Sequence, residues 1–131
     1  MIEKNQQTES DDPLTGKVIS CAINVHRTLG PGLLESVYED CLTFELKQHG
    51  LNVRTQVNVP IIYGDVRIPA GFRADVIVND TLLLELKHVE ELHSIHTAQV
   101  LTYLKLTRLR KALLINFNVK YLREGIKRIV L

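Results

Sequence analysis

The sequence predicts an α/β fold in which a mixed central sheet is flanked by helices. Three observations predict it: helical periodicity at the start of the chain, period-two alternation of apolar residues from residue 51, and a return to a helix and then a buried strand near the end. The length of 131 residues suffices for one hydrophobic core. This order of helices and strands is typical of an α/β domain.

The first third of the chain predicts a tail and two helices. Residues 1–12 are polar without periodicity, so we expect a disordered tail before a single domain over residues 13–131. The first helix is expected over residues 13–29. The second should run from Pro31 to about residue 49, because a Gly-Pro-Gly sequence separates the two apolar stripes. Its predicted buried stripe is Leu34, Val37, Cys41 and Phe44.

The middle of the chain predicts two hairpins. Residues 53–59 alternate between apolar and polar, which indicates a strand that Pro60 ends or bends. Gly64 and Asp65 separate two apolar runs and indicate a turn. Two further apolar runs, at residues 72–78 and 82–87, predict the second hairpin.

Charged residues on this second hairpin are the strongest functional signal. Residues 74, 76 and 78 share one apolar face with 82, 84 and 86 if Val76 lies opposite Leu84. That register needs a loop of odd length, most simply residues 79–81. It also places Asp75 opposite Glu85, with Lys87 two residues further along the same face.

Two opposed carboxylates repel each other unless a positive charge lies between them. Carboxylate oxygens suit Mg²⁺ or Mn²⁺, so this face predicts a hard divalent cation. The alternative is a cluster of lysine and carboxylates that merely solvates an exposed sheet face.

The last third predicts a helix, a buried strand and a charged end. Ser94 resembles an N-cap of a helix that runs to about Leu106, on which Gln99 and Tyr103 share a face. Residues 111–117 form an apolar run that predicts a buried strand. Residues 126–131 are expected to form a short helix or an edge strand, and an edge strand could mediate a homodimer.

Charge and cysteine usage narrow the class of protein. The net charge is +1, but residues 105–131 carry eight Lys or Arg against one Glu, net +7. This basic end could contact phosphates, or it could simply form solvated outer faces. No apolar run has the length of a membrane span and no signal peptide is recognisable, so we expect a cytoplasmic protein. Cys21 and Cys41 are expected to be buried small hydrophobes.

Three residues at fixed spacing, Gly32, Glu35 and Tyr38, match the pattern that names the GxxExxY proteins. The chain resembles this mostly prokaryotic family of small PD-(D/E)XK-like domains, in which Asp, a gap and then Glu-x-Lys form the signature. Ala74 stands where the family usually has a proline before the Asp. Similar segments lie at residues 24–35, 71–75, 84–87, 99–105 and 113–117, so that the resemblance covers residues 13–131.

The resemblance implies a restriction-endonuclease-like αβββαβ core and a Mg²⁺- or Mn²⁺-dependent nuclease that hydrolyses DNA or RNA. It implies metal ligands at Asp75, Glu85 and Glu35, a catalytic lysine at Lys87, a supporting polar residue at Gln99, and tyrosines Tyr38 and Tyr103 beside the site. The alternative function is a catalytically silent nuclease-like module that binds or regulates a protein or nucleic-acid partner.

Other side chains near the predicted site are candidates for substrate binding. Arg73, His88 and His96 could contact phosphate, whereas Arg73 could instead form a simple ion pair with a carboxylate. A zinc site made of His88, His93 and His96 is a weaker alternative, because their spacings of five and three are not the usual helical pair.

Overall fold

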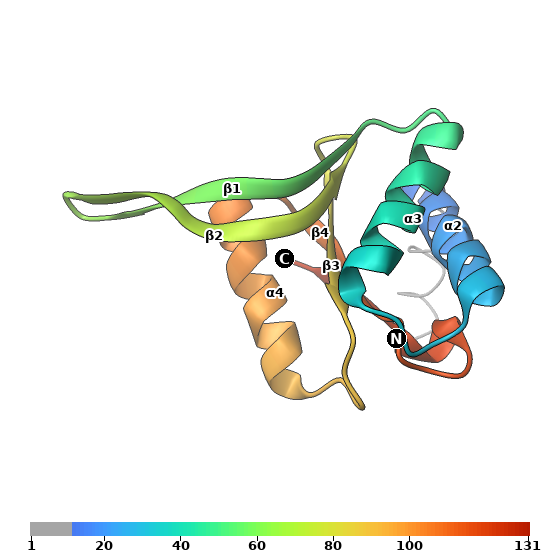
Figure 1. Ribbon diagram of the computed structural model, residues 1–131. Helices are drawn as coiled ribbons and strands as arrows, with labels where there is room; N and C mark the ends of the chain where they lie inside the picture. The colour runs from blue at the N-terminus through green and yellow to red at the C-terminus, as the bar shows by residue number, and fades with distance from the viewer. Residues whose placement is uncertain (1–11) are drawn as a thin grey trace.

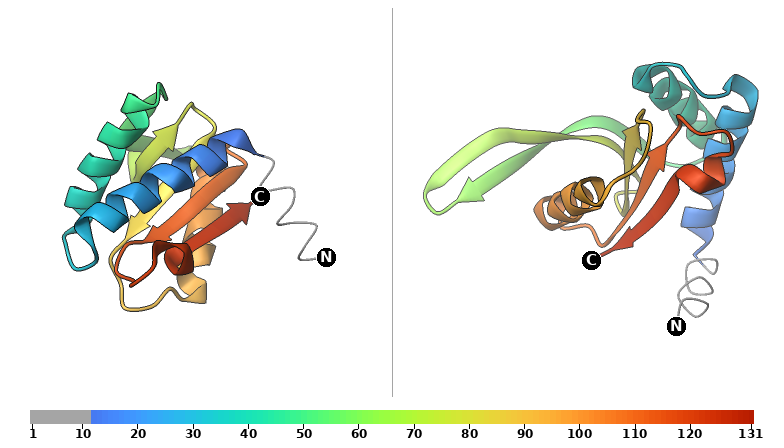
Figure 2. Two further views of the ribbon diagram at one scale, coloured as in Figure 1. Left: turned by 90° about the vertical axis from the view of Figure 1, so that its right-hand side faces the viewer. Right: turned by 90° about the horizontal axis from the view of Figure 1, so that it is seen from below.

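The computed structural model describes residues 12–131, which form a mixed five-stranded sheet with helices on both faces (Figures 1 and 2). In chain order the elements are α2 (Pro13–Leu29), α3 (Glu35–Gln48), β1 (Val53–Tyr63), β2 (Val66–Val78), β3 (Leu82–Lys87), α4 (Ser94–Thr107), β4 (Lys111–Asn116), the 3₁₀ helix η1 (Leu122–Gly125) and β5 (Ile126–Val130). The predicted α/β fold is confirmed, and α3 to β4 follow the expected αβββαβ order.

The sheet separates two layers of helices. The strand order is β1-β2-β3-β4-β5, with β3 and β4 parallel and the other neighbours antiparallel. Helices α2 and α3 cover one face, and α4, the crossover between the two parallel strands, covers the other (Figure 2). A crossover helix is the usual connection between parallel strands, and it explains why β3 and β4 are apolar on both faces.

The hairpin of β2 and β3 has the predicted register. Val76 lies opposite Leu84, and residues 79–81 form the connecting loop. The second face of this hairpin is not exposed, because α4 packs over it and buries Ile77 and Leu83. The alternative of a solvated, exposed charged face is therefore wrong.

The hairpin of β1 and β2 extends well beyond the helices (Figure 1). Tyr63 pairs with Val66 across the predicted turn, which confirms a hairpin at this position. The register shifts between Val59 and Ile61, so Pro60 occupies an irregularity within a continuous strand. Proline cannot donate to the ladder, and it therefore bends β1 here without ending it.

The predicted buried stripe of α3 is wrong. Leu34 and Phe44 are 73% and 61% exposed, whereas Tyr38, Leu42 and Leu46 are fully buried. The buried residues are spaced by four, so they also form a helical stripe, on a neighbouring face of the helix. The apolar residues of α3 allow two stripes, and the one that contains Tyr38 packs into the core.

The start and the end of the chain were predicted to form a disordered tail and a short helix or edge strand. The predicted disorder of residues 1–11 lies outside the described residues, while Asp12 caps α2 by accepting the backbone N–H of Leu14. At the other end, β5 pairs with β4 at the sheet edge, as one of the two alternatives predicted. The homodimer through this edge stays a prediction. Within residues 12–131 no helix combines the length and apolar character that crossing a bilayer requires.

Candidate active site

The candidate active site lies where β2 separates from β3. Regular pairing of the two strands ends at Val76 and Leu84. Beyond this point the side chain of Asp75 replaces a backbone partner, because its Oδ2 accepts the N–H of Leu86 at 2.9 Å. The backbone N–H of Asp75 donates in turn to Glu85 Oε1 at 3.4 Å. The structure thus brings together the two carboxylates that the predicted register opposed.

These two carboxylates are withdrawn from water and close to each other. Glu85 is only 4% exposed and Asp75 is half-buried. Burial, followed by the charge of Asp75, raises the pKa of Glu85 to about 8. Burial also raises the pKa of Asp75. Without a cation the pair therefore retains a proton near neutral pH, because two adjacent buried carboxylates cannot both ionise cheaply.

Lys87 and Tyr103 flank the pair from a strand and from a helix. The charge of Lys87, at the end of β3, lowers the pKa of both Asp75 and Glu85, so its ammonium lies near both. Tyr103 comes from α4, and burial followed by the charges of Glu85 and Asp75 raises the pKa of its hydroxyl. Its ring stacks on Phe72, with 4.3 Å between centroids. Lys87 and Tyr103 are therefore the side chains through which β3 and α4 act on the charge of the carboxylate pair.

Two further predicted residues lie around this pair. Gln99 is half-buried on α4, one turn before Tyr103, and shares the helix face that turns toward the carboxylates. Arg73 is exposed on β2, opposite Asn58. Within the described chain Arg73 forms no ion pair with either carboxylate, so the simple ion-pair explanation of this arginine finds no support.

Glu35, the predicted third carboxylate, stands apart from the pair. It is the first residue of α3 and is exposed. Across residues 12–131, no third His, Cys, Asp or Glu joins Asp75 and Glu85 in a group whose ligand atoms all lie within 4.8 Å of one another. The structure therefore does not bring Glu35 into contact with the other two predicted ligands.

The sequence reasoning missed Glu39, one turn after Glu35 on α3. Burial raises the pKa of Glu39 and the charge of Asp75 raises it further, against the hydrogen bond that Glu39 Oε1 accepts from Gln56 at 2.7 Å. Gln56 has a left-handed φ of 50° and lies between Thr55 and Val57, which pair with Val76 and Ala74 of β2. The i, i+4 spacing from Glu35 could have indicated Glu39, whereas no sequence signal marks Gln56.

The carboxylate pair fits a hard divalent cation. Asp75 and Glu85 offer oxygen atoms alone, which suit Mg²⁺ or Mn²⁺ better than a softer metal. A divalent charge would also relieve the repulsion that raises the pKa of Glu85. Asp75 and Glu85 are therefore the residues that would hold such an ion.

The predicted histidines have different positions. His88 follows Lys87, and its buried Nδ1 has no hydrogen-bond partner among the described residues. Such an atom is rare in folded proteins and is available to a bound group. His96 instead caps α4, because its Nδ1 accepts the backbone N–H of His93 at 2.9 Å, and the side chain of His93 accepts the N–H of His96. Thus His93, and not Ser94, is the N-cap.

The zinc alternative is not supported by this arrangement. His88, His93 and His96 do not form a group of three close ligand atoms within residues 12–131. Their capping bonds explain two of the three side chains without a metal.

Tyr38 does not border the carboxylates as predicted but lies in the core. Its side chain is 0% exposed, and its ring stacks on Phe117 with 4.4 Å between centroids. The hydroxyl donates to the carbonyl of Gly30 at 2.6 Å and accepts the N–H of Leu33 at 3.1 Å. Tyr38 therefore fixes the loop that leads into α3, and the geometry offers it no contact with a substrate.

One of three comparisons with known proteins identifies a superfamily for this chain. Neither the curated proteins nor the solved structures provided a match. The sequence model of the PD-(D/E)XK nuclease superfamily, however, matches residues 12–129. The matched range includes Asp75 and the Glu85-Leu86-Lys87 segment, which follow the Asp and Glu-x-Lys order and meet at one point of the sheet. This chain belongs to the PD-(D/E)XK nuclease superfamily.

Proposed function

We propose that this protein is a Mg²⁺- or Mn²⁺-dependent nuclease that hydrolyses phosphodiester bonds in DNA or RNA. The observation that carries the proposal is the buried Asp75–Glu85 pair with Lys87 beside it, at the separation of β2 from β3. Structural carboxylates are seldom buried next to each other without a compensating charge, because their mutual repulsion is costly.

Each side chain has a distinct role in the proposed reaction. A divalent cation held by Asp75 and Glu85 would supply a water of lowered pKa and neutralise phosphate charge. Lys87 orients the attacking water or stabilises the charge that develops on the phosphoryl group. Gln99 and Tyr103 keep the surroundings of the pair in position from α4.

The helix carboxylates belong to the surroundings of this site. Glu39 lies within electrostatic reach of Asp75, and Glu35 lies one turn earlier on α3. We propose that they hold ordered water or a second cation, with Glu39 the closer partner. Arg73, His88 and His96 are proposed to contact the phosphates that flank the scissile bond. The match of Gly32, Glu35 and Tyr38 supports assignment to the GxxExxY group within the superfamily.

A basic hollow beside the segment that follows β4 supports a nucleic-acid substrate. It has a volume of about 550 Å³, and its lining includes Arg27, Lys120, Tyr121 and Arg123. The segment after β4 begins next to Lys87, because the N–H of Phe117 donates to the carbonyl of Lys87 at 3.1 Å. A few residues later the same segment lines the hollow. Three cations beside an exposed aromatic ring suit a phosphate backbone with a base nearby.

The test is metal binding and cleavage in the same samples. Mn²⁺ is titrated into the wild type and Asp75→Asn, and both are then incubated with single- and double-stranded DNA and RNA. Asparagine keeps an oxygen that can accept the Leu86 N–H, so the fold should survive. The matched control is Asp65→Asn, at the exposed turn of the β1–β2 hairpin. Binding and cleavage should be lost together in Asp75→Asn and kept in Asp65→Asn.

A second candidate function is a catalytically silent module that binds a nucleic acid or a protein. One observation favours it: no third ligand side chain closes around Asp75 and Glu85 within residues 12–131. In that case the wild type binds nucleic acid in a salt-sensitive way without turnover in Mg²⁺ or Mn²⁺. Cleavage of equal rate in the wild type and Asp75→Asn would contradict the proposed active site.

A further inference from the structure

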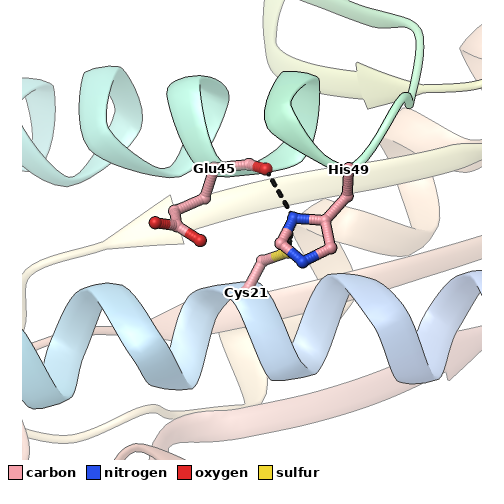
Figure 3. A group of neighbouring side chains, drawn as sticks. All are labelled: Cys21, Glu45 and His49. Atoms are coloured by element: carbon pink, nitrogen blue, oxygen red, sulfur yellow. Dashed lines mark hydrogen bonds between the residues drawn. The ribbon is translucent and has the colours of Figure 1, made fainter.

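A second cluster of ligand side chains lies between α2 and α3, away from the carboxylate pair. Figure 3 shows Cys21 of α2 facing Glu45 and His49 at the end of α3. The ligand atoms of these three side chains all lie within 4.8 Å of one another. The residues are far apart in sequence, so the packing of the two helices assembles the cluster.

The thiol of Cys21 and the imidazole of His49 lie at nearly the separation of two ligands on one tetrahedral ion. Metal–sulfur and metal–nitrogen bonds of roughly 2.3 and 2.0 Å separate neighbouring tetrahedral ligands by about 3.5 Å. The Sγ of Cys21 lies 3.6 Å from Nδ1 of the His49 ring. Because Nδ1 also contacts the backbone carbonyl of Glu45, a metal bound through Nε2 requires the exposed ring of His49 to turn toward Sγ.

The hydrogen bonding of His49 prepares one ring nitrogen for a metal. Its Nδ1 lies 2.9 Å from the backbone carbonyl of Glu45 (Figure 3). A carbonyl can only accept, so this contact assigns the proton to Nδ1 and leaves the lone pair on Nε2. Histidines that bind metals commonly donate their other N–H to a carbonyl in this way.

The chemistry of the three ligands selects the metal. Thiolate and imidazole favour zinc over magnesium, and the two anionic ligands, Cys21 and Glu45, balance a divalent charge. Glu45 is available because it forms no ion pair within the described part of the chain. A hollow of about 440 Å³ adjoins the three side chains, so a metal can enter and water can occupy a fourth position.

We propose that Cys21, Glu45 and His49 form a zinc site that joins α2 to the C-terminal end of α3. The site is independent of the proposed nuclease centre, which offers oxygen ligands alone. The thiol of Cys21 is buried, as expected of a small hydrophobe, and forms no disulfide. Burial, and next the charge of Glu45, raise the pKa of this thiol, so zinc binding should release a proton and strengthen with rising pH.

The experiment uses Zn²⁺ and its spectroscopic substitute Co²⁺ on the full chain. We expect one equivalent of Zn²⁺ to bind, to raise the midpoint of thermal unfolding, and to compete with Co²⁺. Bound Co²⁺ should give the ultraviolet charge-transfer band of a thiolate ligand and the visible bands of a tetrahedral ion. Cys21→Ser and His49→Ala should both lose the charge-transfer band and weaken Zn²⁺ binding by more than the roughly 10–100-fold that loss of an outer-shell partner costs.

Matched variants distinguish this site from others. Cys41→Ser removes the other free thiol, which lies outside the cluster, and Asp75→Asn removes a ligand of the proposed nuclease centre. Both should keep the cobalt spectrum. Because Cys21 is buried, circular dichroism without metal checks that each variant is folded, and the exposed His49 provides a variant that leaves the core intact. A cobalt spectrum without a thiolate band, or one unchanged in His49→Ala, would overturn the proposal.

Discussion

Glu85 has an ionisable group where ionisation is costly. Its neighbours are Asp75, which disfavours the charge, and Lys87, which favours it, and the net effect with burial is a pKa of about 8 against the ordinary 4.5. Between these pH values the metal-free folded protein holds more protons than the unfolded chain. The contribution of Glu85 to the free energy of unfolding is therefore greatest below pH 4.5 and decreases as the pH rises toward 8.

Glu85→Gln should remove most of this pH dependence, because glutamine is neutral throughout. We expect the variant to be more stable than the wild type at pH 8 by a few kcal/mol, on the order of 1.4 kcal/mol for each unit of pKa shift. Urea unfolding in the presence of a chelator, at pH 5 and pH 8, measures the effect. Glu91→Gln, at an exposed position, is the control and should keep the wild-type slope. A slope that is unchanged in Glu85→Gln would contradict the assigned pKa.

In the proposed nuclease reaction, Lys87 acts on the attacking water or on the charge of the phosphoryl group. Removing one positioned donor from a developing oxyanion commonly lowers the turnover rate by roughly 10²–10³-fold. Lys87→Met should lower cleavage by this amount while Mn²⁺ still binds to Asp75 and Glu85, since methionine retains most of the apolar volume. Single-turnover cleavage and calorimetry measure the two properties. The control is Lys105→Met, at an exposed position of α4. It should leave both cleavage and Mn²⁺ binding unchanged.

At the scale of elements, the entry into α3 depends on Tyr38. Gly30 and Gly32 have φ of 77° and 101°, so the loop before the helix uses conformations that other residues rarely adopt. The Tyr38 hydroxyl joins this loop to the helix through the carbonyl of Gly30 and the N–H of Leu33. The spacing from Gly32 to Tyr38 thus has a structural explanation in this chain.

Tyr38→Phe keeps the ring stacked on Phe117 and removes only the two hydrogen bonds. Two part-buried hydrogen bonds are then lost, and at about 0.5–1.5 kcal/mol each they should lower the unfolding free energy by about 1–3 kcal/mol. Denaturant unfolding gives this value, and Tyr121→Phe, at an exposed tyrosine, should change it by less than about 0.5 kcal/mol. A Tyr38→Phe variant as stable as the wild type, with impaired cleavage, would return Tyr38 to the functional site.

Periodicity predicted the elements of the sheet well and one helix face poorly. The parity of apolar residues in the second hairpin has one consistent register, and Val76 indeed lies opposite Leu84. In α3, by contrast, Leu34 and Phe44 are as apolar as the residues that are buried. The buried face is the one on which the Tyr38 ring stacks on Phe117 and the Tyr38 hydroxyl finds two backbone partners.

At the scale of the whole molecule, the contacts that the sequence does not predict are those between separate helices and strands. Asp75 and Glu85 meet within one hairpin, so strand parity sufficed to predict them. Glu39 approaches Asp75 only because α3 lies against the sheet at a particular angle. Likewise, Cys21 contacts His49 because α2 packs against α3. The periodicity of apolar residues within either helix does not predict this contact.

The basic end of the chain acts through the same long-range assembly. Lys120 and Arg123 join Arg27 around one hollow, because α2 is tied to this segment by His26, whose Nε2 donates to the carbonyl of Val119 at 2.8 Å. If this hollow follows the backbone of the substrate, each lysine or arginine there should displace counterions from the nucleic acid. Its contribution then appears in the salt dependence of binding and not in the chemistry of cleavage.

Replacing Lys120 and Arg123 together by glutamine tests this role. The slope of log K against log salt should become shallower by about 1.4 to 1.8, as expected for two phosphate contacts. Binding is measured in an Asp75→Asn background, so that cleavage does not consume the ligand. The control is Lys47→Gln, in the last turn of α3. Lys47 does not line the hollow, so this variant should keep the full slope. An unchanged slope in the double variant would show that the basic end is a solvated face, and that the substrate follows another path to the carboxylates.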